Sequence, residues 1–317
     1  MVINLGYSKI PFKTKMSGGL EMEQVDREGR SDSQGNDDQS LFLQAKNTYF
    51  DMVATKLKYQ YLNRDENFPN KDAGNVPTDA TYYKRFDRRY DTASRRQHIY
   101  SISFDITPME KLDVGLEYRK KAAEYPTTKM GLQSSKSHEI YSDATYIFGD
   151  LATLNVFVDY EKSTRKTQKR VGPTVNGDPD APWTSTAYNW GFTVEDKILS
   201  YGVNIAFQLI EEELKWLISA SRENVDGSQS FVNQRPLLLP DIDAWGDYKK
   251  DELGTNLIYT WRKNWDANLG YKYQHLYYDD ISTNGYRLNT GTDIFTGAYN
   301  DSNYNANMIY LTATYRF

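Results

Sequence analysis

The chain has 317 residues, a formal net charge of −5 and no cysteine. Without cysteine it cannot form a disulfide, a thiolate nucleophile, a cysteine-ligated metal site or the covalent bonds that hold c-type haem. The acidic balance gives no electrostatic reason to bind nucleic acid, and no segment approaches the roughly 18 apolar residues of a transmembrane helix. The mean hydropathy of −0.74 still allows a transmembrane β-barrel, because each strand of a barrel wall needs only about 10 alternating residues.

Segments in which apolar and polar residues alternate recur along the whole chain. In one of them, Leu112, Val114 and Leu116 alternate with Asp113 and Gly115. Successive side chains of a strand point to opposite faces, so each segment predicts a strand with one apolar and one polar face. The pattern predicts about thirteen strands, at residues 2–9, 17–27, 39–49, 52–63, 96–106, 112–120, 137–148, 152–162, 194–208, 214–223, 250–261, 267–278 and 304–317.

The connections between these strands alternate in length. Short ones lie at 50–51, 107–111, 149–151, 209–213 and 262–266, and long polar ones at 63–95, 163–194, 224–249 and 279–303. Outer-membrane barrels have short periplasmic turns and long extracellular loops, whereas a β-sandwich has no reason to alternate so regularly. The sequence therefore predicts an all-β fold, an antiparallel transmembrane β-barrel of the bacterial outer membrane, with residues 1–317 as a single barrel domain.

Aromatic residues gather where the predicted strands meet the predicted connections. Phe148, Trp216 and Trp265 lie beside short connections, and Tyr118 and Tyr160 lie nearer the long ones. Tyrosine also pairs well across strands in any sheet, but that preference does not explain the clustering at strand ends. Aromatic girdles at both membrane interfaces are typical of outer-membrane barrels.

The polar face of the predicted strands carries charges of both signs. A strongly ion-selective pore would favour one sign, so the mixture does not indicate such a pore. The residues predicted to face the lumen are Lys56, Lys58, Glu117, Arg119, Asp159, Lys272 and Arg316.

No motif in the chain indicates catalysis or a metal site. His98, His138 and His275 lie on or beside different strands and match no H-E-x-x-H pattern, and no G-x-S-x-G elbow is present. Residues 32–38 contain oxygen ligands that calcium would accept, but not at EF-hand spacing, so a solvated loop is the preferred interpretation. We therefore predict no enzyme activity, no catalytic residues and no cofactor or metal bound by this chain.

The last predicted strand ends in an aromatic carboxyl terminus, as the assembly signal of outer-membrane barrels does. Ile309, Leu311, Ala313, Tyr315 and Phe317 fall on one side of this strand. We expect the first four to face outward and Thr312, Thr314 and Arg316 to face inward. The predicted assembly signal consists of Ile309, Leu311, Tyr315 and Phe317.

The number and direction of the predicted strands bear on whether the barrel is complete. An odd number of strands cannot close a bacterial single-chain barrel of the usual kind. The first residues also lack the basic and apolar regions of a signal peptide, although an outer-membrane protein must be exported. We therefore expect an amino-terminally truncated barrel whose first strand has an unpaired edge.

Two turn-and-strand units, residues 111–118 and 266–273, and the run from Asp293 to Phe317 resemble the MtrB/PioB family. Members of this family are large outer-membrane barrels that sheathe a multihaem c-type cytochrome. The resemblance implies a barrel of about twenty-six strands, of which this chain would be the carboxyl-terminal half. The chain lacks the cysteine pair found near the amino terminus of some members, a departure that fits a carboxyl-terminal half.

The resemblance also implies a function. The chain would be a non-enzymatic sheath that positions a multihaem cytochrome, its partner, for electron transfer across the outer membrane, with lipid as the other neighbour. Haem would then be present only in the partner. A general porin or solute channel is the alternative, and an outer-membrane hydrolase is a more distant one.

Overall fold

The computed structural model describes residues 2–28, 35–67, 87–88, 93–128, 130–170, 189–233, 242–261, 264–280, 287–289, 294–296 and 303–315. Within these ranges the regular elements are β-strands. The described residues contain no helix long and apolar enough to cross a membrane. The strands are β1 (Val2–Ile10), β2 (Thr14–Asp26), β3 (Gly35–Phe50), β4 (Val53–Asn67), β5 (Asp87–Arg88), β6 (Arg95–Met109), β7 (Leu112–Glu124), β8 (Met130–Phe148), β9 (Ala152–Arg170), β10 (Asn189–Ile210), β11 (Leu214–Asn233), β12 (Asp247–Trp261), β13 (Trp265–Asp279), β14 (Arg287–Asn289), β15 (Ile294–Thr296) and β16 (Tyr304–Tyr315).

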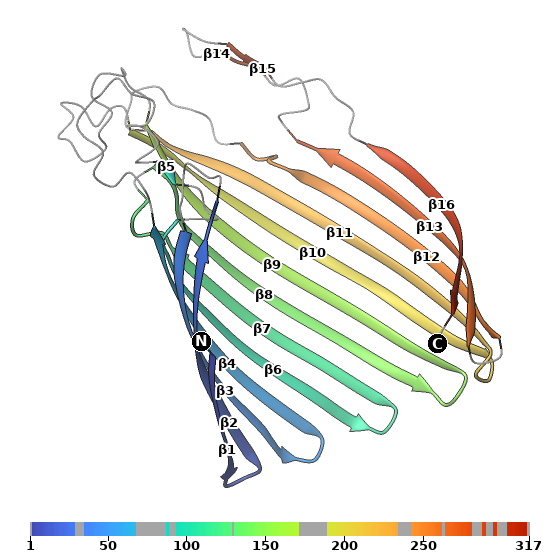
Figure 1. The fold of residues 1–317 in the computed structure, drawn as a ribbon. Coiled ribbons are helices and arrows are strands. Elements are labelled where there is room, and N and C mark those ends of the chain that lie inside the picture. Colours follow the sequence, from blue (N-terminus) through green and yellow to red (C-terminus); the bar gives the residue numbers. More distant parts are fainter. Residues whose placement is uncertain are drawn as a thin grey trace.

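Thirteen of these strands form one antiparallel sheet in which each strand pairs with the next one along the chain. The order is β1-β2-β3-β4-β6-β7-β8-β9-β10-β11-β12-β13-β16, with β5 beside β8 and a separate β14–β15 hairpin. The thirteen strands correspond one to one with the predicted ones, so the predicted all-β antiparallel fold is confirmed. Figure 1 shows that the sheet curls into an open trough, with the short turns along one rim.

Several strands are longer than predicted at the end away from the short turns. β9 reaches Arg170 instead of residue 162, and β11 reaches Asn233 instead of residue 223. β3 begins at Gly35, so the second half of the segment 32–38 is strand rather than loop, and Asp38 forms an ion pair with Arg64 at 2.6 Å. These predictions were wrong because, beyond the lipid, a strand keeps its ladder of hydrogen bonds but needs no apolar face.

Side chains on the convex face of the sheet form an apolar band with nothing packed over it in the described structure. On β9 the band comprises Ala152, Leu154, Val156, Val158 and Tyr160, and the next convex residue is Lys162. Nine residues span about 30 Å along a strand, or roughly 23 Å across a bilayer when the strand is tilted by about 40°. This height agrees with the roughly 25 Å apolar band of outer-membrane barrels.

Conventional core packing is almost absent from the described residues. One small buried cluster, Ala93, Ala123 and Tyr125, lies at the long-loop end, while large apolar residues such as Ile309 and Leu311 are 76% exposed. A soluble protein would bury such side chains, whereas a barrel wall presents them to lipid.

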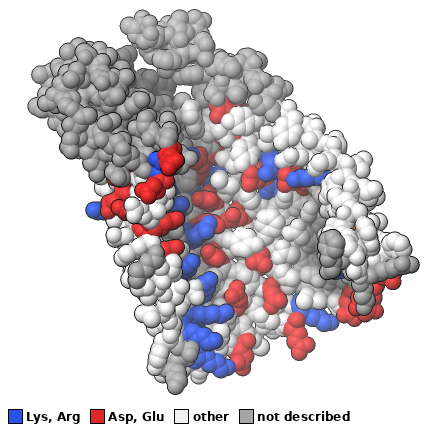
Figure 2. All heavy atoms as spheres, in the orientation of Figure 1, with Lys and Arg blue, Asp and Glu red and all other residues white. Residues whose placement is uncertain are grey.

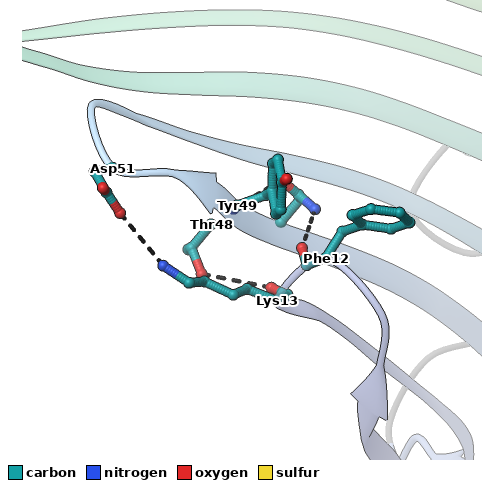
Figure 3. Close-up of polar contacts among 6 residues, drawn as sticks. Phe12, Lys13, Thr48, Tyr49 and Asp51 are labelled. Atoms are coloured by element: carbon teal, nitrogen blue, oxygen red, sulfur yellow. Dashed lines mark hydrogen bonds and ion pairs between the residues drawn. The ribbon is translucent and has the colours of Figure 1, made fainter.

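Two neighbouring short turns are joined by polar contacts at the rim (Figure 3). The Asn47 side chain donates hydrogen bonds to the carbonyl oxygen of Phe12 and to the Thr14 hydroxyl, both at 2.8 Å. Lys13 Nζ lies 3.3 Å from the Asp51 carboxylate. Phe12 has a positive φ of 62°, which a residue other than glycine adopts at a cost, so these contacts fix the turn that joins β1 to β2.

The two edges of the sheet are not paired with each other in the described structure. β1 pairs only with β2, and β16 pairs only with β13. Both edge strands run toward the short-turn rim, because β1 leads into a short turn and Tyr315 lies opposite Trp265 just after another. The edges are therefore parallel to each other, and the trough stays open.

Candidate functional site on the concave face

Cross-strand pairing shows which predicted lumen residues share a face. Directly opposite residues on neighbouring strands point to the same side of a sheet. Lys56 lies opposite Ser103, Ser103 opposite Glu117, Glu117 opposite Tyr141, and Tyr141 opposite Asp159. Lys58 and Arg119, two residues along from Lys56 and Glu117, follow the same parity.

Lys272 reaches the same face through a second series of opposite residues. The series runs from Lys272 through Gly254, Ser219 and Asn204 to Asn155, which is four residues from Asp159 on β9. Arg316 lies outside the described residues. Figure 2 shows that charged side chains gather in the hollow of the trough, so this shared face is the concave one.

A polar groove of about 330 Å³ brings together four of the predicted residues, Lys56, Lys58, Glu117 and Arg119. The Arg119 Nε donates a hydrogen bond to the Glu139 carboxylate at 3.0 Å on the groove wall. Asp159 and Lys272 lie outside the groove. Lys272 instead forms an ion pair with Glu252 at 3.1 Å on the far side of the trough.

A row of lysines crosses the concave face near the short-turn rim. Lys15 lies directly opposite Lys46, and Lys46 lies directly opposite Lys56, with Lys58 two residues farther along β4. None of these four lysines has an ion-pair partner in the described structure, and Lys15, Lys46 and Lys56 are exposed. We call Lys15, Lys46, Lys56 and Lys58 the concave lysine row.

The sequence interpretation missed Lys15 and Lys46, although a signal for Lys46 was present. Alternation with Leu43 and Ala45 places Lys46 on the polar face of β3, and a β-bulge between Asn47 and Phe50 sets the register in which Lys46 lies opposite Lys56. The charges of both signs on the concave face are therefore not evenly mixed. Acidic residues predominate farther round, where Glu139 lies directly opposite Glu161 and near Asp159.

Glycines let aromatic rings lie flat against the concave wall. The ring of Tyr310 covers Gly270, where a Cβ atom would collide with it, and its hydroxyl donates a 2.5 Å hydrogen bond to Asn256. Phe157 covers Gly202 in the same way. The wall between the charged regions therefore has a low profile, which suits contact with a broad surface better than capture of a small molecule.

The three histidines lie on the convex face and on different strands. His98 pairs with the Tyr59 hydroxyl at 2.9 Å, His138 with the Tyr118 hydroxyl at 2.8 Å, and His275 with Asn305 at 2.7 Å. Among the described residues, no group of three or more histidine, aspartate or glutamate side chains could hold a metal ion. The histidines therefore contribute hydrogen bonds to the convex face and do not line the polar groove.

The last described strand carries most of the predicted assembly signal. Ile309 lies opposite Tyr271 and Leu311 opposite Leu269 on the convex face, and the Tyr315 ring lies 4.9 Å from that of Trp265. Thr312 and Thr314 point to the concave face, opposite Asn268 and Asp266. Phe317 lies outside the described residues.

Comparison with known proteins identifies the fold and the family. Residues 8–317 match the family described as outer membrane beta-barrel porin, MtrB/PioB. The chain is 22% identical over 306 residues to outer membrane protein MtrB of Shewanella baltica (strain OS185), covering 95% of this chain and 40% of that protein. The chain thus spans about two fifths of the length of this relative.

Two solved outer-membrane transporters share the fold. The copper transporter OprC superposes with a TM-score of 0.58 at 12% identity, over 95% of this chain and 41% of OprC. The siderophore receptor PiuA from Acinetobacter baumannii superposes with a TM-score of 0.53 at 12% identity, over 86% of this chain and 47% of PiuA. The trough is therefore a wall of outer-membrane β-barrel type.

Proposed function

The chain belongs to the MtrB/PioB family of outer-membrane β-barrel porins, and from this premise we propose that it helps to sheathe a multihaem c-type cytochrome. The sheath would hold the cytochrome so that electrons cross the outer membrane. The chain itself is part of a barrel wall in that membrane, as its fold and its relatives show. The observation that carries the proposal is the concave face, which is broad, polar and charged, with a lysine row near the short-turn rim and acidic residues around Glu139.

We propose further that other strands complete the barrel. The parallel edges β1 and β16 can both be joined in an antiparallel ladder only if an odd number of strands lies between them. A second copy of these thirteen strands would meet each edge in parallel, so additional strands of a longer chain fit better. An exposed edge of this length is otherwise a template for aggregation.

The width of such a barrel favours a protein occupant. About 26 strands, spaced by about 4.8 Å and tilted by about 40°, give a barrel roughly 50 Å wide between backbones. After side chains take up about 10 Å, the space still admits a folded domain of about 100 residues, which is roughly 34 Å across. A hole of that size left empty would not be selective, and wide transporter barrels are plugged.

The charges would orient the occupant. The concave lysine row suits an acidic surface on the cytochrome, such as one bearing haem carboxylates, and the acidic side of the trough suits a basic surface. Because this chain has no cysteine, c-type haem would be attached covalently only to the partner. The side chains of the wall would exclude lipid, orient the partner and carry no electrons.

The lysine row also favours the alternative, a general porin or solute channel. Rings of lysine and arginine line pores that pass anions and phosphates. A channel, however, needs a constriction, and the described residues fold no segment into the trough.

Photocrosslinking in whole outer membranes separates the two functions. A photoreactive residue replaces Ser101 on the concave face or its neighbour Tyr100 on the convex face, in the full-length protein. The sheath predicts a haem-containing adduct from position 101 and none from position 100. A haem-free preparation that conducts ions in planar bilayers, with no adduct at position 101, would overturn the sheath and support the porin.

A further inference from the structure

A second set of basic side chains lies on the convex face, at the long-loop end of the apolar band. Lys120 on β7 lies directly opposite His138 on β8, His138 opposite Lys162 on β9, and Lys162 opposite Lys197 on β10. Lys136 lies two residues beyond His138 on the same face. We call Lys120, Lys136, His138, Lys162 and Lys197 the convex basic belt.

The belt begins where the apolar band stops. The adjacent row, two residues nearer the short turns, consists of Tyr118, Ile140, Tyr160 and Leu199. From that row to the short turns, the described convex face of β7–β10 carries no charged side chain. Tyrosines at the interface and cations just beyond them mark the level of lipid headgroups, here in the outer leaflet because long loops are extracellular.

The charges of the belt are only partly balanced within the described structure. Glu195 is shared by Lys162 and Lys197, at 2.9 and 3.5 Å, and Asp226 lies opposite Lys197. Lys120 and Lys136 are exposed and form no ion pair with any described residue. Lys162 and Lys197 lie directly opposite one another, and like charges in that position destabilise a sheet, so an anion at this level would stabilise the wall.

We propose that the convex basic belt binds the phosphate groups of a phosphorylated glycolipid of the lipid A type in the outer leaflet. Lysine ammonium groups bind phosphate as point charges, and their alkyl stems can lie along lipid chains while the amines reach the headgroups. The four-strand row is about 14 Å long, given strands about 4.8 Å apart, so it can meet more than one phosphate. The proposal does not depend on what fills the trough.

Lipid titration of the full-length protein tests the proposal. The purified barrel, stripped of lipid in neutral detergent, is titrated with diphosphorylated lipid A, enzymatically dephosphorylated lipid A, phosphatidylglycerol and inorganic phosphate. Three proteins are compared: the wild type, the variant K120Q/K136Q/K162Q, and the variant K121Q/K215Q/K250Q. The last removes three lysines from the concave face, including Lys121 next to Lys120, and so controls for net charge.

The wild type should bind diphosphorylated lipid A most tightly. Each lysine near an anionic surface contributes about fivefold in affinity, so the convex variant should bind about 100-fold more weakly while the concave variant is unchanged. Equal affinity of the two variants would overturn the proposal. So would equal binding of dephosphorylated lipid A or of phosphatidylglycerol by the wild type, or displacement of lipid A by equimolar inorganic phosphate. The wild-type comparisons hold even if a variant fails to fold, which heat-modifiable gel migration would reveal.

Discussion

The concave lysine row and the convex basic belt are built alike but face different surroundings. In each, basic side chains lie directly opposite one another on neighbouring strands, Lys15–Lys46–Lys56 in one and Lys120–His138–Lys162–Lys197 in the other. The row lies in the hollow near the short turns, where water and ions can screen it. The belt lies at the far end of the lipid-facing band, where its net positive charge meets headgroups. Both sets of basic side chains attract anions, but the anions come from the contents of the trough on one side of the wall and from lipid headgroups on the other.

The largest difference between the faces should appear in the middle of the apolar band. Val156→Lys on the convex face should lower the free energy of unfolding by about 2–4 kcal/mol, the cost of a lysine near the bilayer midplane. Its concave neighbour Asn155→Lys places an amine near Asp143 and should cost no more than about 1 kcal/mol. Equilibrium unfolding in lipid vesicles measures both, and equal costs would contradict our assignment of the faces.

The next largest effect on stability is expected from adding a methyl group to a glycine of the concave face that lies under an aromatic ring. Gly270→Ala must displace the Tyr310 ring and break its bond to Asn256, so we expect a loss of about 1–3 kcal/mol. The control Gly254→Ala meets only the Ser219 hydroxyl, which can rotate away, and should change stability by less than about 0.5 kcal/mol. Thermal unfolding of the two variants in the same detergent distinguishes them.

Removing the middle lysine of the concave lysine row should raise the free energy of unfolding, by less than the two preceding substitutions lower it. Lys46→Gln relieves repulsion from Lys15 and Lys56, so the barrel without its partner should gain about 0.5 kcal/mol at low salt. The gain should vanish near 1 M salt, where charges are screened beyond about 3 Å. A loss of stability at low salt would show that the row is already neutralised.

The smallest effect is expected for the exposed ion pair between Lys13 and Asp51 at the short-turn rim. The Lys13 and Asp51 side chains are 62% and 93% exposed, so Asp51→Ala should cost only a few tenths of a kcal/mol. Asn47→Ala removes three side-chain hydrogen bonds from the same turns and should cost about 1 kcal/mol. If both variants unfold alike, the contacts in Figure 3 do not fix the rim.

The sequence predicted strands and their faces correctly wherever contact with lipid requires an apolar residue at every second position. On β9, alternation from Ala152 to Tyr160 predicted both the strand and its apolar face, because every second residue must meet lipid. Beyond Tyr160 that requirement ends, and the strand continues to Arg170 without a pattern that sequence reasoning could recognise. The positions at which the strands end on the long-loop side therefore could not be predicted from the sequence.

Charge on the concave face was only partly predictable, for a related reason. Alternation assigns Lys56 to the polar face, but its neighbours depend on how the strands align. Alternation could also have assigned Lys46 to the polar face, but its position opposite Lys56 depends on a β-bulge between Asn47 and Phe50. Lys15 precedes the predicted strand at 17–27, so no pattern placed it opposite Lys46. The convex belt was not predicted because four of its residues lie near the ends of four different predicted strands, and only the register across β7–β10 shows that they form one row.

The unequal lengths of the strands give the extracellular rim an uneven height. β11 continues for 13 residues past Ala220, which raises it by about 33 Å above the apolar band, while β13 continues for six residues past Tyr273, or about 15 Å. At the mouth of the trough, strand β11 is therefore high and strand β13 is low. The described part of the wall therefore offers far more protein surface above the lipid at β11 than at β13.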